Sequence, residues 1–256
     1  SIVFPGVGRL TGEDTGIGRL AEPEEIFDAA LACLNGPLTG LRVCVTAGGT
    51  REPIDAVRFI GNYSSGKQGL AFAKAARHLG AEVLVIAANI EEESLSGFDA
   101  LHVRTSGELR EALMKQVEAI DVLVMSAAVA DFSSQHPSTD KIKRSEVGES
   151  LTLNLIANPD ILKEFVELIK GKSKKVLTVG FAAEAGGNLE TLGKSKLEAK
   201  GCDFIVANDI SDGAVFGSPD NSVLLISRES TSTHQGSKES VASAVLAVVA
   251  SKVRKL

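Results

Sequence analysis

Short apolar runs alternate with longer amphipathic segments along most of this chain. The apolar runs are rich in Val, Ile and Leu and end in Gly or polar residues, which is typical of buried strands. They lie at 41–47, 82–88, 100–105, 121–132, 175–184, 202–209 and 222–227, with a short edge strand predicted at 233–235. The segments between them repeat apolar residues at helical spacing. Helices are therefore predicted at 66–79, 106–119 (capped by Ser106), 158–169, 189–200 and 238–253.

This alternation predicts an α/β fold: a doubly wound, mainly parallel sheet, Rossmann-like, with helices on both faces. The composition agrees, because only 4% of the residues are aromatic and none is Trp, so aliphatic side chains must fill the core. Residues 1–40 are rich in Gly and Pro, with one amphipathic helix at 22–34 and no strand pattern strong enough for a domain. We therefore expect a tail at 1–40 and a sheet domain at 41–256.

Charge and cysteine content exclude several classes of protein. The formal net charge of −6 argues against a nucleic-acid partner, which would need a basic face. Cys33, Cys44 and Cys202 form no CxxC pair and are expected to be buried thiols in a reducing compartment. No stretch is long and apolar enough to span a membrane, and the first residues lack the order of a signal peptide. We expect a cytoplasmic protein with no membrane partner.

Four predicted strands end in small or polar residues. The endings are TAGGT (46–50), SAAVADF (126–132), GFAAE (180–184) and VAND (206–209). Ligands of doubly wound sheets bind beyond the carboxyl ends of the strands, so these four endings should line one crevice.

The long loop after the first of these strands closes with Ser64, Ser65 and Gly66 at a predicted helix start. Free N–H groups and the helix dipole favour a phosphate or carboxylate there, whereas the simpler interpretation is a serine that caps the helix. The Gly48-Gly49 pair is a weak dinucleotide signal, because the helix begins much later. The second strand also ends in Ala87-Ala88-Asn89, without the acid that holds a ribose. A nicotinamide-dependent oxidoreductase is therefore the poorer hypothesis.

Charged residues near these endings have two interpretations each. Asp131 is either a simple turn-former or a ligand for a metal or a sugar hydroxyl. Lys141 belongs to a basic cluster after the polar segment 133–140, which is either solvated or a mobile lid that carries cations over a polyphosphate. Lys196 and Lys200 lie one helical turn apart, as a solvated face or as a clamp for a triphosphate.

The motifs go further than these alternatives. The segment VTAGGTREPIDAVRFIGNYSSGKQG closely resembles the opening of bacterial phosphopantothenoylcysteine synthetases. The likeness continues in order through SAAVADF, KIKR, LIANPDIL, VGFAAE, KLEAKGCDFIVAND and GAVFGSPDNSVLLI, over roughly 41–250. Residues 1–40 resemble the tail of the flavin-containing decarboxylase that precedes the synthetase in many bacteria. Gly61, where the family commonly has Ser, and the segment AANIEEE (87–93) depart from the family pattern.

The resemblance implies a ligase that joins 4′-phosphopantothenate to L-cysteine and uses CTP. The substrate carboxylate would form an acyl-cytidylate and release pyrophosphate, and the cysteine amine would then expel CMP. Mg²⁺ is expected with CTP, while FMN would belong only to the decarboxylase body, which this sequence does not contain. The family also implies a homodimer, which could form part of a larger assembly with a fused decarboxylase.

The resemblance also implies residue roles. Asn62 would contact the acyl group and stabilise the intermediate, with Lys141 as the lid lysine. Ser64, Ser65 and Gly66 would line the substrate or phosphate pocket, to which Arg58 is also assigned. The residues implied at the nucleotide are Ala128, Asp131, Lys141, Phe181, Lys196 and Lys200. No metal-ligand set can be read from the sequence. A non-catalytic module that binds CTP without consuming it is a second rival.

Overall fold

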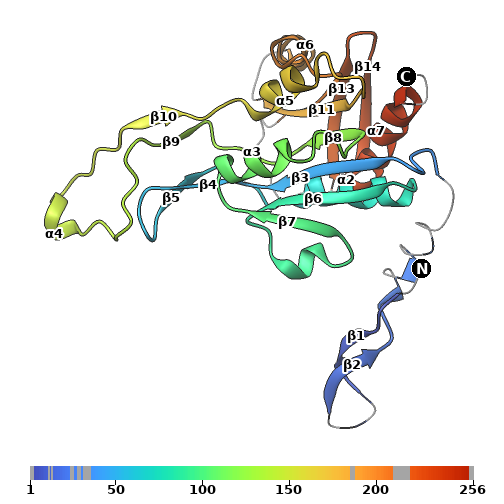
Figure 1. The fold of residues 1–256 in the computed structure, drawn as a ribbon, viewed down its shortest axis with the longest axis horizontal. Coiled ribbons are helices and arrows are strands. Elements are labelled where there is room, and N and C mark those ends of the chain that lie inside the picture. The colour runs from blue at the N-terminus through green and yellow to red at the C-terminus, as the bar shows by residue number, and fades with distance from the viewer. Residues whose placement is uncertain are drawn as a thin grey trace.

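In a computed structural model, eight strands form one central sheet (Figure 1). The structure describes residues 3–10, 12, 14–23, 26–27, 30, 36–184, 188–209 and 220–253. The strands of the central sheet are β3 (Arg42–Gly48), β6 (Glu82–Ala88), β7 (Asp99–Val103), β8 (Val122–Met125), β11 (Leu177–Glu184), β12 (Phe204–Asp209), β13 (Asp220–Ser227) and β14 (Thr231–Ser237). Their order is β14-β13-β12-β11-β8-β3-β6-β7.

The strand directions confirm the doubly wound, mainly parallel sheet. The strands from β12 to β7 all pair in parallel, while β13 and β14 are antiparallel additions at one edge. The chain leaves β3 for β6 and β7 on one side and then returns to β8 on the other. The order of the strands therefore reverses between β3 and β8, and this switch point is where such sheets bind ligands.

Helices cover both faces of the sheet, as predicted. Helices α2 (Lys67–His78) and α7 (Lys238–Val253) pack on one face. The other face is covered by α3 (Ser106–Met114), α5 (Ile161–Ile169) and α6 (Leu189–Lys200). Val43 and Val45 join the first core, whereas Cys44 between them joins the second. Successive strand side chains point to opposite faces, so a strand covered twice must be apolar throughout.

Several predicted boundaries are wrong. Helix α3 ends at Met114 rather than at 119, and its cap is Thr105, whose Oγ1 accepts a hydrogen bond from Glu108 N at 3.2 Å. Ser106 already belongs to the helix and is buried, and its N–H donates to Glu52 Oε1 at 2.8 Å. The predicted edge strand at 233–235 is real, and as β14 it is longer on both sides.

Smaller elements lie outside the main sheet. They are the pairs β1 (Gly6–Arg9) with β2 (Thr15–Arg19), β4 (Arg51–Pro53) with β5 (Phe59–Gly61) and β9 (Phe132–Ser134) with β10 (Leu155–Ala157), and the short helices η1 (Glu92–Leu95) and α4 (Arg144–Val147). The Gly-rich segments of the first pair lack a clear strand pattern, so this hairpin was not predicted. Most of the predicted helix at 22–34, with Cys33, lies outside the described residues.

Residues 132–157, which we call the arm, project away from the sheet in Figure 1. The strands β9 and β10 form its base and α4 lies near its tip, while the β4–β5 hairpin runs beside it. The predicted lid, including Lys141, is therefore part of an extended structure with its own pairing.

Candidate functional site

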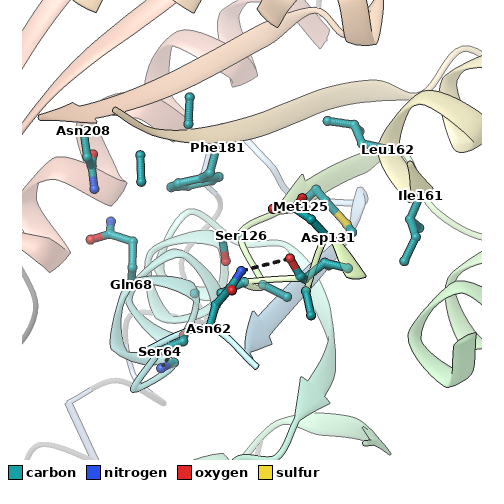
Figure 2. Close-up of a pocket in the computed structure, with 18 of the residues that line it drawn as sticks. Asn62, Ser64, Gln68, Met125, Ser126, Asp131, Ile161, Leu162, Phe181 and Asn208 are labelled. Atoms are coloured by element: carbon teal, nitrogen blue, oxygen red, sulfur yellow. Dashed lines mark hydrogen bonds between the residues drawn. The ribbon is translucent and has the colours of Figure 1, made fainter. Parts of the chain in front are cut away.

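Three of the four predicted strand endings, those after β8, β11 and β12, line a cavity of about 590 Å³, and the loop after β3 with the start of α2 completes its wall (Figure 2). It opens at the carboxyl ends of β3, β8, β11 and β12, beside the switch point of the sheet. Nine of the eleven predicted site residues contribute to its wall: Asn62, Ser64, Ser65, Gly66, Ala128, Asp131, Phe181, Lys196 and Lys200. The convergence is thus present for three endings, while the fourth (46–50) is joined to the loop after β8 and contributes no residue to the wall. The roles of these residues stay predictions.

The start of α2 forms one wall of the cavity. Gly66 precedes the helix with φ 72° and no side-chain capping bond. Ser64 does not cap the helix in the usual way, because its hydroxyl donates to Gly48 O at 3.0 Å and accepts from Gly66 N at 3.3 Å. The serine therefore holds the turn against β3 and leaves the first N–H groups of α2 without a side-chain cap.

A close approach between α2 and the sheet brings this wall into place. A Cβ on Gly69 would lie 2.5 Å from Ala47 Cβ and 2.7 Å from Ser126 Oγ. Only glycine lets the first turn of the helix rest on the ends of β3 and β8. Ser126 Oγ in turn donates to Thr46 O at 2.6 Å, which joins the two strand ends.

The loop after β8 is held from two sides. Asn62 Nδ2 donates to Val129 O at 3.0 Å (dashed in Figure 2), and Asn158 Nδ2 donates to Ala130 O at 2.8 Å. Asn158 N also donates to Asp131 O at 2.8 Å. These bonds fix the backbone that carries Asp131 at the cavity.

Ala128 lies where this loop joins the loop that follows β3. Its N–H donates to Gly48 O at 2.8 Å, and its carbonyl accepts from Thr50 N at 3.1 Å. These two hydrogen bonds join the loop after β8 to the loop after β3 beside the cavity. The small side chain of Ala128 takes up little of the cavity's volume.

The two lysines of α6 already have acidic partners. Lys196 Nζ lies 2.5 Å from Glu184 Oε1, and Lys200 Nζ lies 2.6 Å from Asp160 Oδ2. Both lysines are part-exposed, so these ion pairs contribute little to stability. An anion that enters the cavity can therefore replace the carboxylates as the partner of each lysine.

The wall also contains residues that sequence reasoning did not select. Ile161 and Leu162 add an apolar wall at the start of α5, next to the predicted Phe181, whose ring packs edge-on against Phe72 with ring centroids 5.2 Å apart. Asn208 at the end of β12 lines the cavity with its buried Oδ1, for which no described residue supplies a hydrogen bond. The signal for these residues was their position: each follows a strand or begins a helix at the carboxyl edge.

Two predicted site residues lie outside the cavity wall. Arg58 is bound to Asp55 through Nε at 2.9 Å and through Nη2, and Nη2 also donates to Ile142 O at 2.9 Å. Lys141, next to Ile142, is exposed on the arm. Neither residue contributes to the cavity, and Arg58 instead fastens the arm to the turn after β4.

The segment predicted as a lid is hydrogen-bonded to the turn after β4. Ile142 N donates to Asp55 Oδ2 at 3.1 Å, and Ser138 N donates to Ile54 O at 3.0 Å. The side chain of Asp55 is fully buried, and hydrogen bonds from Arg58 and from backbone N–H groups hold the pKa of its carboxyl well below its usual range. Backbone contacts far apart in sequence thus supply the anchor that no apolar residue supplies.

We expect Asp55→Asn to release the arm. The lost charge weakens the bonds to Arg58 and Ile142, so hydrogen exchange at the Ile142 amide should accelerate roughly tenfold or more. A carboxyl with a lowered pKa stabilises the fold at pH values above its unfolded pKa and loses this effect as the pH falls. The difference in melting temperature from wild type should therefore persist above about pH 4 and shrink only below it. Asp140→Asn, at an exposed position of the same segment, is the control and should change neither quantity.

The structure does not supply a metal cage or reactive thiols within its described ranges. No group of three or more His, Cys, Asp or Glu side chains that could hold a metal occurs among those residues. Cys44 and Cys202 are free and buried, and burial raises the pKa of each thiol to about 12. Of the residues described, no helix has the length and apolarity needed to cross a membrane.

Comparison with known proteins decides the family. A family model for the C-terminal domain of DNA/pantothenate metabolism flavoproteins matches residues 38–253. The chain belongs to this family. Its predicted division at residue 40 stays a prediction.

Two relatives support the assignment of the chain to this family. The coenzyme A biosynthesis bifunctional protein CoaBC of Mycobacterium bovis is 40% identical over 259 residues, covering 96% of this chain and 62% of that protein. The chain therefore spans less than two thirds of that relative. A crystal structure of the C-terminal domain of a CoaBC protein is 31% identical with a TM-score of 0.69, covering 87% of this chain and all of that one.

A more distant structure shares the fold. A Cab2 mutant in complex with phosphopantothenate-cysteine has a TM-score of 0.67 and 18% identity, covering 84% of this chain and 87% of that one. At this identity the likeness concerns the architecture alone. The Rossmann-like sheet predicted from the strand pattern is thus the fold of the flavoprotein C-terminal domain family.

Proposed function

We propose that the chain is a phosphopantothenate–cysteine ligase of coenzyme A biosynthesis, which joins 4′-phosphopantothenate to L-cysteine with CTP. The observation that carries the proposal is the cavity at the switch point, where Asn62, Asp131 and the start of α2 meet the lysines of α6. The relationship to CoaBC proteins supports the same reaction. The CoaBC relatives are bifunctional and longer, so we also propose a fused or associated decarboxylase, which would hold the FMN.

The first chemical step needs positive charge at the triphosphate. The substrate carboxylate attacks the α-phosphorus of CTP, forms the acyl-cytidylate and releases pyrophosphate. Two anions must approach each other, so the site must neutralise both. In the proposed step, Lys196 and Lys200 exchange their carboxylate partners for triphosphate oxygens and offset the charge that develops on the leaving pyrophosphate.

Asn62 suits the second step. The nitrogen of cysteine attacks the acyl carbon, the bond to the phosphate oxygen breaks and CMP leaves, while the amine proton passes to solvent. The Asn62 amide donates one N–H to Val129 O, which orients the side chain and leaves a second N–H for the ligand. A preoriented donor of this kind stabilises the charge that develops on the acyl oxygen.

Mg²⁺ fits the site as a companion of the nucleotide. Mg²⁺ is usually held by one or two carboxylates together with substrate phosphates, rather than by a cage of protein ligands. The acidic groups at the cavity wall are Asp131 and Asp160, and Asp160 is paired with Lys200. Asp131 is therefore the residue we assign to the ion, which would neutralise phosphate charge when bound.

We predict that CTP is preferred over ATP. A pocket that pairs with the edge of cytosine leaves buried polar groups unpaired when it meets adenine, which costs on the order of 10-fold or more in kcat/KM. Steady-state rates with the two nucleotides, each with Mg²⁺, test this. Equal kcat/KM values would contradict the preference without contradicting the ligase.

A homodimer is also predicted, and we propose the arm as its contact surface. Apolar side chains are exposed on the arm and the β4–β5 hairpin: Phe59, Phe132, Leu155 and Ile156. The edge strand β14, by contrast, is polar. Light scattering should give the mass of two chains, and Ile156→Asp should shift it toward one chain. Leu168→Asp, at an equally exposed position on α5, should leave the dimer intact, and a monomeric wild type would contradict the prediction.

An oxidoreductase is less well supported by the geometry. Asn89, at the position where a dinucleotide-binding fold carries an acid, uses its amide internally to bind Gly49 O and Arg104 O, each at 2.9 Å. Product formation separates the remaining possibilities. We expect 4′-phospho-N-pantothenoylcysteine by mass spectrometry when 4′-phosphopantothenate, CTP and cysteine are present. A nucleotide-sensing module would bind CTP without product, and an oxidoreductase would require NAD(P)H. The cytoplasmic location stays a prediction.

A further inference from the structure

Lys238 is a lysine on the core-facing side of α7. The helix buries Val241, Ala242 and Val245 against the sheet, each exposed by 1% or less. Lys238 precedes them by three, four and seven positions, so it lies on the same side of the helix. A charged group on this stripe is unfavourable unless its ammonium reaches polar surroundings beyond the apolar core.

The topology places those polar surroundings at the cavity. Strand β14 is antiparallel to β13, which is antiparallel to β12, so β14 runs in the direction of β12 and ends at the same edge. Gly236 has φ 132°, and Ser237 Oγ accepts from Ser240 N at 3.1 Å, which turns the chain at once into α7. Lys238 thereby becomes part of the cavity wall.

Lys238 approaches the cavity from the side opposite to the lysines of α6. Helix α7 packs on α2, and Glu239 Oε1 lies 3.7 Å from Lys74 Nζ. Because α7 and α2 share one core and α6 belongs to the other, the first turn of α7 lies on the other face of the sheet from Lys196 and Lys200. The cavity therefore has cations on both sides of the sheet edge, an arrangement that suits an extended polyanion better than a single small anion.

We propose that Lys238 is a further phosphate-binding residue of this cavity. The ligand chemistry is a phosphoryl group, from either the triphosphate of the nucleotide or the 4′-phosphate of the pantothenate substrate. The inference rests on the proposed function for these two sources. According to this proposal, the segment that follows the antiparallel strands β13 and β14 also takes part in ligand binding.

The experiment is titration calorimetry of Lys238→Gln with CTP, pyrophosphate and 4′-phosphopantothenate as separate probes. A charge-assisted hydrogen bond lost from a phosphate should weaken binding by about 10- to 100-fold. Lys238→Arg keeps the charge and should remain within a few-fold of wild type. Lys252→Gln is the matched control, because Lys252 lies at the far end of the same helix and pairs with Glu229 at 2.7 Å. The melting temperatures of the variants exclude unfolding as the cause.

Each pattern of results has one meaning. A loss confined to CTP and pyrophosphate assigns Lys238 to the triphosphate, and a loss confined to 4′-phosphopantothenate assigns it to the 4′-phosphate. Unchanged binding of all three probes would overturn the inference, and so would an equal loss in Lys238→Arg. A wild type that forms no ligation product but shows the Lys238 effect on pyrophosphate would refute the proposed function alone. A wild type that binds none of the probes would refute both.

Discussion

Lys141→Gln is expected to slow acyl-cytidylate formation by on the order of 100-fold or more while leaving the melting temperature nearly unchanged. The side chain is exposed on the arm, so it contributes little to folding. Its neighbour Ile142 is fixed by Asp55, so the lysine is presented from a held backbone. Because Lys141 is not packed in the core, its replacement should slow the reaction only if its ammonium group contacts a ligand. Pyrophosphate release at saturating CTP measures the effect.

The control is Lys143→Gln, two positions further along the arm. Lys143 lies 3.6 Å from Glu146 and is also exposed, so a general loss of positive charge on the arm would affect both variants alike. Wild-type rates for Lys141→Gln would contradict the lid hypothesis. Mixing Lys141→Gln with an inactive cavity variant adds a second readout, because recovery of activity would show that the lysine serves the cavity of a second copy.

Asn62→Ala is expected to lower kcat by roughly 100- to 1,000-fold, the usual cost of removing a preorganised donor to a developing oxyanion. The side chain makes one hydrogen bond, at 3.0 Å to Val129 O, at an exposed position, so the fold should tolerate the change. If Asn62 acts on the acyl group in the transition state, KM for CTP should change much less than kcat. Steady-state kinetics with both substrates varied separate the two quantities.

Asn154→Ala provides the matched control for Asn62→Ala. Asn154 is an exposed amide on the arm whose carbonyl, not its side chain, accepts from Gln135 N at 2.8 Å. Its removal should leave kcat within experimental error. A kcat for Asn62→Ala close to wild type would remove Asn62 from the chemistry and leave it as a support for the loop after β8.

The strand pattern predicted the part of the site that depends on sheet topology. Runs such as 41–47 and 82–88 are apolar throughout because helices cover both faces, and their polar endings therefore had to meet at one edge. For this reason the sequence predicts that Asp131 and Phe181, which are far apart along the chain, line the same crevice.

Contacts outside the sheet could not be predicted in this way. Arg58 is turned from the cavity by Asp55, three positions earlier, and the same carboxylate holds Ile142 on the arm. The spacing of apolar residues along the chain does not indicate that Asp55 contacts Arg58 and Ile142. The cap of α3 depends on where the backbone changes from extended to helical. Thr105 is still extended (φ −109°) and Ser106 is already helical, so Thr105 is the cap. Lys238 was overlooked because its position follows from the antiparallel end of the sheet.

Pyrophosphate release without cysteine is the most direct test of the ligase assignment. With 4′-phosphopantothenate, CTP and Mg²⁺ alone, we expect a burst of about one pyrophosphate per active site, because the acyl-cytidylate accumulates until an amine attacks it. Adding cysteine should convert the burst into continuous turnover, with CMP and 4′-phospho-N-pantothenoylcysteine formed in equal amounts. No pyrophosphate under either condition, from a protein that binds CTP, would contradict the assignment.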